Sequence, residues 1–316
     1  KTLKKNDIFF AIKGKKRDGN SFVKKAFDNG ALFAIVNRYQ KSLSRNYQFK
    51  VSNTLECLTN LSKIIRQNFN GKIIAITGSC GKTSLKQMTG EVLNNFSKTT
   101  FSIESYNNKY GVPLSLFNLN TKNKNGVFEI GMDKKGEIDF LSKILKPNIG
   151  VITNISYAHA KNFKNINEIA AAKGELIYNI QKGGIIILNK DDRFFNFHHK
   201  NALKRDLKIF SFGIKKKGNI SLISTKKENK FFKIAVKIFN QKKLFYLKNI
   251  NQNNIYNVLA CVSIIYSIGE LKNLSINSFI KFENPQGRGD ISKIYFKNKQ
   301  FYLVDESYNS NPLSME

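Results

Sequence analysis

The sequence predicts an α/β protein built around a parallel sheet that carries helices on both faces. Short apolar runs of β type alternate with helical stretches along most of the chain, the order expected of parallel strands joined by crossover helices. One such run, residues 72–77, leads through a loop bounded by Gly78 and Gly81 directly into a helix. A strand, a glycine-bounded loop and a helix in this order predict a phosphate-binding loop.

Length and composition fit a globular protein of about two domains. The chain has 316 residues, of which 41% are hydrophobic, enough for a sizeable core. Its 53 Lys and Arg residues outnumber its 22 Asp and Glu residues, for a formal net charge of +31. Such a charge suggests nucleic-acid binding, but the lysines are spread over every segment together with abundant Asn, Ile and Phe. We therefore expect a solvated basic surface that attracts anionic substrates, and no nucleic-acid partner.

Cysteine usage and hydropathy bear on the compartment. Cys57, Cys80 and Cys261 are odd in number and show no metal-type spacing, so we expect free thiols in a reducing cytoplasm rather than a disulfide framework. No apolar run approaches the roughly 18 residues of a transmembrane helix, so we expect no membrane span.

The first 70 residues predict a small α/β domain. Strand-like runs at 8–14 and 31–37 flank a helical stretch at 20–29. A second helix at 54–69 follows, and Thr54 is a residue type favoured as its cap.

A larger central domain is expected over residues 71–283. After the loop and its helix at 82–95, strands are predicted at 99–103, 126–130, 149–153, 184–188 and 208–211. Residues 219–248 change to β-type runs that predict an antiparallel extension, and a helix opens near Asn253. From residue 284 a third segment begins, with short strands at 291–296 and 301–304.

The loop itself predicts a site for ATP or GTP. Backbone N–H groups at the start of the following helix favour an anion. Lys82 can reach the β- and γ-phosphates, and the Thr83 hydroxyl can ligate Mg²⁺. Ile76 stands where the longer P-loop pattern has glycine, so the loop has the shorter form Gly-x-x-Gly-Lys-Thr.

Polar residues that follow strands should converge on this loop, because ligands bind at the carboxyl ends of parallel strands. Glu129 ends one strand, and Thr153, Asn154 and His159 follow another. Glu129 is then a candidate Mg²⁺ ligand and His159 a ligand of a second metal or a donor to phosphate. Taken alone, a strand Glu is more often a pairing residue and a lone His more often a structural hydrogen-bonder. Lys173 alone would be an exposed helix lysine, and His198 and His199 are expected at the surface.

Several motifs together resemble the Mur ligases, a family of ATP-dependent amide-forming enzymes of peptidoglycan synthesis. The resemblance runs the length of the chain and is closest to the MurF type, which adds D-alanyl-D-alanine to UDP-N-acetylmuramoyl-tripeptide. It is carried by the nucleotide loop at 77–83 and by the segments Phe10-Ala11-Ile12-Lys13-Gly14 with Asp18-Gly19 and Phe22, Tyr106-Asn107-Asn108-Lys109-Tyr110-Gly111-Val112-Pro113-Leu114, Glu129-Ile130-Gly131-Met132 with Gly136-Glu137-Ile138, and Asp305-Glu306-Ser307-Tyr308-Asn309-Ser310-Asn311-Pro312.

The resemblance implies roles for individual residues. Lys82, His159 and Lys173 are implied as catalytic, and Asn107 and Asn108 as neighbours of the substrate. Lys173 matches a lysine that several members carry as a carbamate, which would turn it into a metal ligand. Implied Mg²⁺ ligands are Thr83, Glu129, His159 and Lys173; implied ATP-binding residues are Thr77, Gly78, Ser79, Cys80, Gly81, Lys82, Thr83, Ser84, Asn254, Asn257, Arg288 and Glu306.

The implied fold has three α/β domains: residues 1–70 for the UDP end of the substrate, 71–283 for ATP, and 284–316 as the start of a nucleotide-binding-fold domain. The match implies a chain shortened at both ends. ATP, Mg²⁺, the UDP-linked tripeptide and D-alanyl-D-alanine are the implied ligands, and the protein is expected to be a cytoplasmic monomer. Three alternatives stay open at this point. The first is another amino acid ligase of the family or a folylpolyglutamate synthase-like enzyme, the second is a nucleic-acid-binding P-loop ATPase, and the third is a binding-only or decayed remnant of such a ligase.

Overall fold

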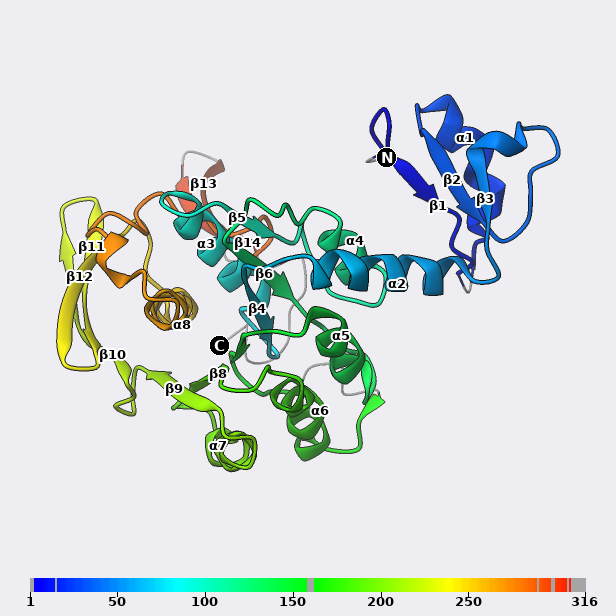
Figure 1. Cartoon of the computed structure of the whole chain (residues 1–316). Coiled ribbons are helices and arrows are strands. Elements are labelled where there is room, and N and C mark those ends of the chain that lie inside the picture. The colour runs from blue at the N-terminus through cyan, green and yellow to red at the C-terminus, as the bar shows by residue number, and fades with distance from the viewer. Residues whose placement is uncertain are drawn as a thin grey trace. The chain divides into compact units, whose positions relative to one another are not determined.

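The computed structural model describes residues 3–14, 16–157, 162–288, 290–296, 299–305 and 307. They form two compact units, residues 1–68 and residues 69–316 (Figure 1). The predicted boundary at residue 70 lies close to this division. The further boundary at residue 284 stays a prediction, because the second unit includes that segment.

The first unit is a small α/β fold with a three-stranded parallel sheet in the order β1-β2-β3. Its core is formed by Ala11, Val23, Ala34 and Val36, with helix α1 packed against the sheet. Along the chain the elements are β1 (Ile8–Phe10), η1 (Gly19–Phe22), α1 (Val23–Asp28), β2 (Phe33–Val36), η2 (Arg45–Tyr47), β3 (Gln48–Lys50) and α2 (Thr54–Gln67).

Helix α2 begins where the sequence predicts, but its cap is a different residue. Asn53 is the cap, and its Oδ1 accepts the N–H groups of Leu55 and Glu56 at 3.0 and 3.1 Å. The Thr54 hydroxyl donates instead to the carbonyl of Ala11 at 3.1 Å. The expectation of a Thr54 cap was wrong because Asn53 supplies the acceptor one residue earlier and leaves Thr54 to tie the helix to the first strand.

The second unit is built on a nine-stranded sheet in the order β12-β11-β10-β9-β8-β7-β4-β6-β5. Every neighbouring pair from β10 to β5 in this order is parallel, while β11 pairs antiparallel with both β10 and β12. The parallel sheet and its antiparallel extension are both as predicted. The strands are β4 (Lys72–Thr77), β5 (Thr99–Phe101), β6 (Asn125–Glu129), β7 (Ile149–Ile152), β8 (Ile185–Asn189), β9 (Lys208–Gly213), β10 (Ile220–Glu228), β11 (Phe231–Ile238) and β12 (Gln241–Leu247).

Helices cover both faces of this sheet, as predicted, and the side-chain alternation of β4 shows how. Ile74 and Ile76 belong to a core shared with α3 and α8, whereas Ile73 and Ala75 belong to a core shared with α4, α5, α6 and α7. Strand β4 is therefore apolar on both sides, which is typical of a central parallel strand. The helices are α3 (Lys82–Asn94), α4 (Gly111–Leu116), α5 (Glu137–Leu145), α6 (Ile166–Tyr178), α7 (Phe195–Leu203) and α8 (Gln252–Ser267).

Beyond α8 lie a short turn of helix, η4 (Leu271–Asn273), and an antiparallel hairpin, β13 (Asp290–Phe296) and β14 (Lys299–Asp305). The hairpin agrees with the two strands predicted there. Within the described ranges, no helix has both the length and the apolar character needed to cross a membrane.

Candidate active site

The loop between β4 and α3 has the backbone of a phosphate cradle. Gly78 has φ 146°, and a Cβ there would lie 1.9 Å from Thr153 Oγ1, so the backbone passes the end of β7 more closely than any side chain would permit. Gly81 has φ 79° and stands at the start of α3, which has no side-chain cap. The positive end of the α3 dipole is thus left available to an anion.

Residues after β7 hold this loop in place, as expected from the sequence. Thr153 Oγ1 donates to the carbonyl of Cys80 at 2.6 Å, and Asn154 Oδ1 accepts the N–H of Cys80 at 2.8 Å. Ser79 is fixed from the same side, because its Oγ accepts the N–H of Ser156 at 2.8 Å. The loop is therefore rigidly attached to the carboxyl edge of the sheet.

Two lysines meet at one carbonyl of the loop. Lys82 Nζ donates to Gly78 O at 2.9 Å and to Ser79 O at 3.2 Å, and Lys173 Nζ, on α6, donates to Gly78 O at 2.8 Å. Burial lowers the pKa of Lys82, while the Glu129 carboxylate opposes that shift. Burial, followed by the positive charge of Lys82, holds the pKa of Lys173 well below its usual value. An anion bound beside the loop would relieve the repulsion between these two amino groups.

Glu129 offers a buried carboxylate next to the same loop. It is 1% exposed, its Oε2 accepts the Thr83 hydroxyl at 2.7 Å, and its Oε1 accepts Asn107 Nδ2 at 2.7 Å. A carboxylate buried to this degree needs donors or cations around it, and a carboxylate beside a hydroxyl is the hard oxygen pair that Mg²⁺ prefers. Thr83 and Glu129 therefore fit a Mg²⁺ ion. Within the described ranges, no group of three or more His, Cys, Asp and Glu side chains is gathered as a metal site.

A cavity of about 600 Å³ opens over the loop, between helices from the two faces of the sheet. On one side it is lined from α8 by Asn253, Asn254 and Asn257, which we call the α8 end. On the other side it is lined by the turn after β6 and the first two turns of α5, which we call the α5 end: Gly131, Met132, Asp133, Gly136, Glu137, Phe140 and Leu141. The phosphate loop and the two lysines lie between these ends.

Most of the residues predicted for the site line this cavity. They are Ser79, Cys80, Gly81, Lys82, Thr83, Ser84, Asn107, Asn108, Glu129, Lys173, Asn254, Asn257 and Arg288. Thr77 and Gly78 do not line it: Thr77 is fully buried at the end of β4, and Gly78 acts through its carbonyl. His159 and Glu306 lie outside the described residues, so their roles stay predictions.

Sequence reasoning missed Lys86 and Ser105. Lys86 is 1% exposed, and its Nζ donates to Ser102 O at 2.7 Å and Glu104 O at 2.6 Å, which fixes the segment that leads into Ser105. Ser105 Oγ lies 3.5 Å from Thr83 Oγ1 and accepts Arg288 Nη2 at 3.3 Å. The spacing of four residues between Lys82 and Lys86 was the available signal, because it places both on one face of α3.

The expectation that His198 lies at the surface was wrong. His198 is 2% exposed, and neither ring nitrogen has a hydrogen-bond partner in the described part of the chain. Burial lowers its pKa to about 4. The ring packs on α6 at Gly174, where a Cβ would come within 3.2 Å of it. The pair of histidines among Lys and Phe looked polar in sequence, but α7 turns this one toward the core.

A loop with the backbone of a phosphate cradle, at the carboxyl edge of a parallel sheet and open to a cavity, is typical of the P-loop nucleotide-binding proteins. Comparison with known proteins narrows that class. The Mur ligase middle domain family matches residues 76–265, which is more than half of the chain. The chain therefore belongs to the Mur ligase family.

Individual members of the family are similar to this chain in sequence and in structure. The UDP-N-acetylmuramoyl-tripeptide--D-alanyl-D-alanine ligase of Buchnera aphidicola is 34% identical over 98% of this chain and 66% of its own length. Among solved structures, MurF from Acinetobacter baumannii superposes with a TM-score of 0.86 at 29% identity, covering 99% of this chain and 67% of that one. MurF from Thermotoga maritima in complex with ADP gives a TM-score of 0.84 at 25% identity, covering 99% and 70%. The chain thus spans about two thirds of the length of the relatives it matches.

Proposed function

We propose that this protein is an ATP-dependent amide ligase that adds D-alanyl-D-alanine to UDP-N-acetylmuramoyl-tripeptide through an acyl phosphate. The observation that carries the proposal is the convergence of Lys82 and Lys173 on the carbonyl of Gly78, with the Thr83 and Glu129 pair beside them. The name of the Buchnera relative and the ADP in the Thermotoga complex support the same reaction and the same cofactor.

The reaction has two chemical steps. A carboxylate oxygen of the tripeptide attacks the γ-phosphorus of ATP in line, the bond to the β-phosphate oxygen breaks, and ADP and an acyl phosphate result. The amine of D-alanyl-D-alanine then attacks the acyl carbon, phosphate leaves with its bonding electrons, and the new amide loses a proton. Little covalent chemistry is asked of the protein, whose part is positioning and charge stabilisation.

The residues around the loop divide this work. Lys82 and the α3 N-terminus stabilise the charge on the transferring phosphoryl group. Thr83 and Glu129 would hold Mg²⁺, which neutralises phosphate charge when bound. Asn107 keeps the Glu129 carboxylate oriented through its 2.7 Å hydrogen bond, and Asn108 borders the same part of the cavity. His159 is proposed as a further metal ligand from its sequence position alone.

Lys173 is proposed to carry a carbamate. A neutral amine is the form that adds to carbon dioxide, and burial beside Lys82 lowers the pKa of Lys173 and so favours that form. The addition joins the amine nitrogen to the carbon of carbon dioxide and releases a proton. It replaces the Lys173 amino group, whose positive charge Lys82 disfavours, with an anion that Lys82 can pair with. Mass spectrometry under bicarbonate, with Lys173→Gln as the control, tests for the added group.

The two ends of the cavity are proposed to hold different substrates. Asn254 and Asn257 at the α8 end are neutral hydrogen-bonding residues that suit the adenine half of ATP. With the triphosphate running from there to the loop, in-line transfer requires the attacking carboxylate on the far side of the γ-phosphate. The peptide substrates therefore belong toward the α5 end.

Phosphate release by the product of the complete gene tests the proposal. ATP and Mg²⁺ are supplied, and UDP-N-acetylmuramoyl-tripeptide and D-alanyl-D-alanine are each added or withheld. Release that requires both, with a pentapeptide product, is the expected result. Phosphate release that does not depend on either substrate and increases with DNA or RNA would contradict the ligase proposal. It would indicate a nucleic-acid-stimulated ATPase, the alternative that the +31 charge suggests. We also expect a cytoplasmic monomer, the setting suggested by the odd number and scatter of the three cysteines in the sequence.

A further inference from the structure

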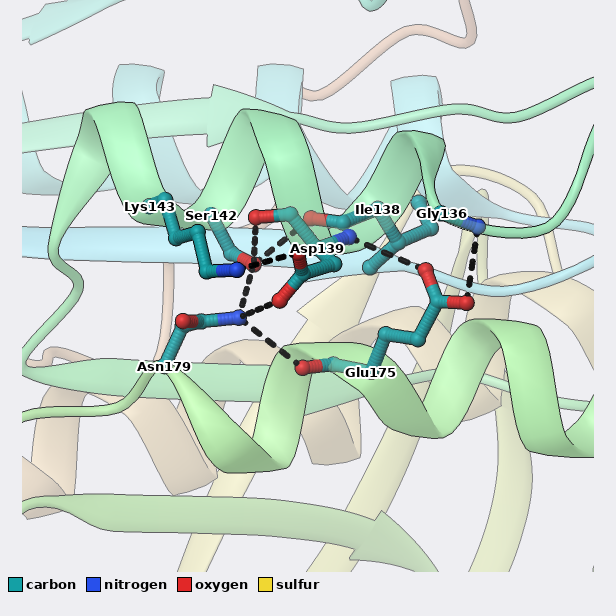
Figure 2. A network of polar contacts seen from close by, with 7 residues as sticks. All are labelled: Gly136, Ile138, Asp139, Ser142, Lys143, Glu175 and Asn179. Atoms are coloured by element: carbon teal, nitrogen blue, oxygen red, sulfur yellow. Dashed lines mark hydrogen bonds and ion pairs between the residues drawn. The ribbon is translucent and has the colours of Figure 1, made fainter.

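Helix α5 has no side-chain cap of its own. Its first residue follows Gly136, which has φ 88° and no side chain that could accept a backbone N–H. The carboxylate of Glu175, on α6, fills this place: Oε1 accepts the N–H of Gly136 at 2.8 Å and Oε2 the N–H of Asp139 at 3.0 Å (Figure 2). One side chain from a neighbouring helix thus satisfies two donors at the start of α5 and places a negative charge at its positive end.

A second set of contacts fastens the same two helices. Asn179, one turn after Glu175, donates from Nδ2 to Asp139 Oδ1 at 2.9 Å and to Ser142 Oγ at 3.0 Å. Asp139 also accepts Lys143 Nζ at 2.6 Å on the outer side (Figure 2). In Figure 1, α5 and α6 run side by side. The N–H groups of Gly136 and Asp139 at the start of α5 are therefore capped from α6 and not by a residue of α5 itself.

Helix α6 also holds the phosphate loop. Lys173, two residues before Glu175, donates to Gly78 O at 2.8 Å. Between these two residues, Gly174 packs against the buried ring of His198, so α7 also contacts α6 at this turn. A single turn of α6 thus connects the phosphate loop with the N-terminus of α5.

The structure held by Glu175 is a wall of the cavity. Gly136, Glu137 and Phe140 line the α5 end. The turn before α5 is attached to the first residue of the helix, because Glu137 Oε2 accepts the N–H groups of Asp133 and Lys134 at 2.6 and 3.0 Å. A shift of the α5 start would move this turn and the lining residues together, while the α8 end is held by other contacts.

We propose that Glu175 is a positioning residue: by capping α5 from α6 it sets the distance between the phosphate loop and the peptide-binding wall of the cavity. The proposal rests on the proposed function for the identity of the substrates. Glu175 itself is half-buried and is not among the residues that line the cavity. Glu175 acts on the reaction by fixing the position of α5. A displacement of bound substrate by about 1 Å can lower the reaction rate by about 100-fold.

The test compares Glu175→Gln with Glu168→Gln. Glutamine keeps the size of the side chain but offers an amide nitrogen, which cannot accept, to one of the two N–H groups. Glu168 is an exposed residue of the same helix whose carboxylate accepts the nearby N–H of Lys164, so it is a matched control. For Glu175→Gln we expect the KM of at least one peptide substrate to rise about 10-fold or more, with the KM of ATP within about 2-fold of wild type. Glu168→Gln should leave all three constants unchanged.

Hydrogen exchange gives a readout that does not depend on turnover. Amides of residues 133–141 should exchange faster in Glu175→Gln than in wild type, while those of 78–84 stay as protected as before. Unchanged exchange at 133–141 would overturn the capping role. Faster exchange with unchanged KM for every peptide substrate, or with an equal rise for ATP, would overturn the assignment of this wall to the peptide substrates. A wild-type protein that releases no phosphate with both peptide substrates would instead count against the proposed function, and the exchange data would still decide the role of Glu175.

Discussion

The two ends of the cavity are both formed by the N-terminal part of a helix, yet they are built in different ways. At the α8 end the helix carries its own cap: Asn251 Oδ1 accepts the N–H of Asn254 at 2.7 Å, three residues on. At the α5 end the acceptor is Glu175, which lies 39 residues beyond the Gly136 amide that it binds. The cap at the α8 end is thus local in sequence, whereas the cap at the α5 end depends on the packing of α6 against α5.

Because the two ends are built independently, we expect substitutions at each end to affect the binding of different substrates. A change at the α8 end should alter nucleotide binding alone, and a change at the α5 end should alter peptide binding alone. A change at the loop between them should stop the reaction whichever end is filled.

The largest effect is expected at the loop. Lys82→Ala removes the amino group that contacts the loop carbonyls and that is proposed to stabilise the transferring phosphoryl group, and should reduce acyl phosphate formation by about 1,000-fold or more. Binding of the UDP-linked substrate, measured by calorimetry, should persist. The exposed Lys98→Ala is the control. Retained turnover in Lys82→Ala would show that Lys82 is not needed for phosphoryl transfer.

The next effect is expected at the carboxylate beside the loop. Glu129→Gln keeps an oxygen for Asn107 or Thr83 but removes the charge that would hold Mg²⁺, so we expect about 100-fold less phosphate release and a higher Mg²⁺ requirement. Titration with Mg²⁺ measures both. Glu91→Gln changes an exposed carboxylate on the same α3 helix and should behave as wild type. An unaltered Mg²⁺ requirement in Glu129→Gln would contradict the metal assignment.

A smaller effect is expected at the α8 end. Asn257 is 5% exposed and its Oδ1 would lie 3.0 Å from a Cβ at Gly81, so it borders the nucleotide loop directly. Asn257→Ala should raise the KM of ATP by about 10-fold, the cost of one hydrogen bond, and leave the KM of both peptide substrates unchanged. Steady-state kinetics with each substrate varied in turn measures this. An equal rise in the KM of ATP and of both peptide substrates would show that the α8 end does not bind the nucleotide selectively.

The last effect is on stability and not on activity: it concerns His198, which packs against α6, and it depends on pH. His198 has a pKa of about 4 in the folded protein because it is buried, against about 6.5 when unfolded. The unfolded chain therefore binds the proton more readily, so the contribution of neutral His198 is complete above pH 6.5 and is lost as pH falls toward 4, by up to about 1.4 kcal/mol per pH unit.

Melting temperatures between pH 7.5 and 4.5 check this. His198→Leu should lose less stability across that range than wild type does, and His199→Leu should follow the wild-type slope. Parallel curves for all three proteins would show that His198 does not titrate as its burial implies.

Much of the fold could be predicted from the chain, because the central strands are apolar on both sides and stand between helical stretches. Of the site, the loop at 78–84 was predicted from local spacing, and the roles proposed for Lys173, Asn254 and Arg288 rest on the resemblance. Lys86 and Glu175 were not found, since a charged helix residue looks the same in sequence whether it is solvated or buried against backbone groups. The same ambiguity produced the error at His198.

By itself, the sequence determined the features that depend on near neighbours: the strand, loop and helix at 72–94 and the alternation that makes a parallel sheet. It also indicated an Asn cap for α8, although the cap is Asn251, two residues before the Asn253 at which the helix was expected to open. The tertiary structure decided which distant groups meet. It brought Lys173 to the carbonyl of Gly78 across 95 positions and Glu175 to the amide of Gly136 across 39. Local preferences act over a few residues, whereas these contacts depend on how α5 and α6 pack on the sheet, which no short stretch of the chain can specify.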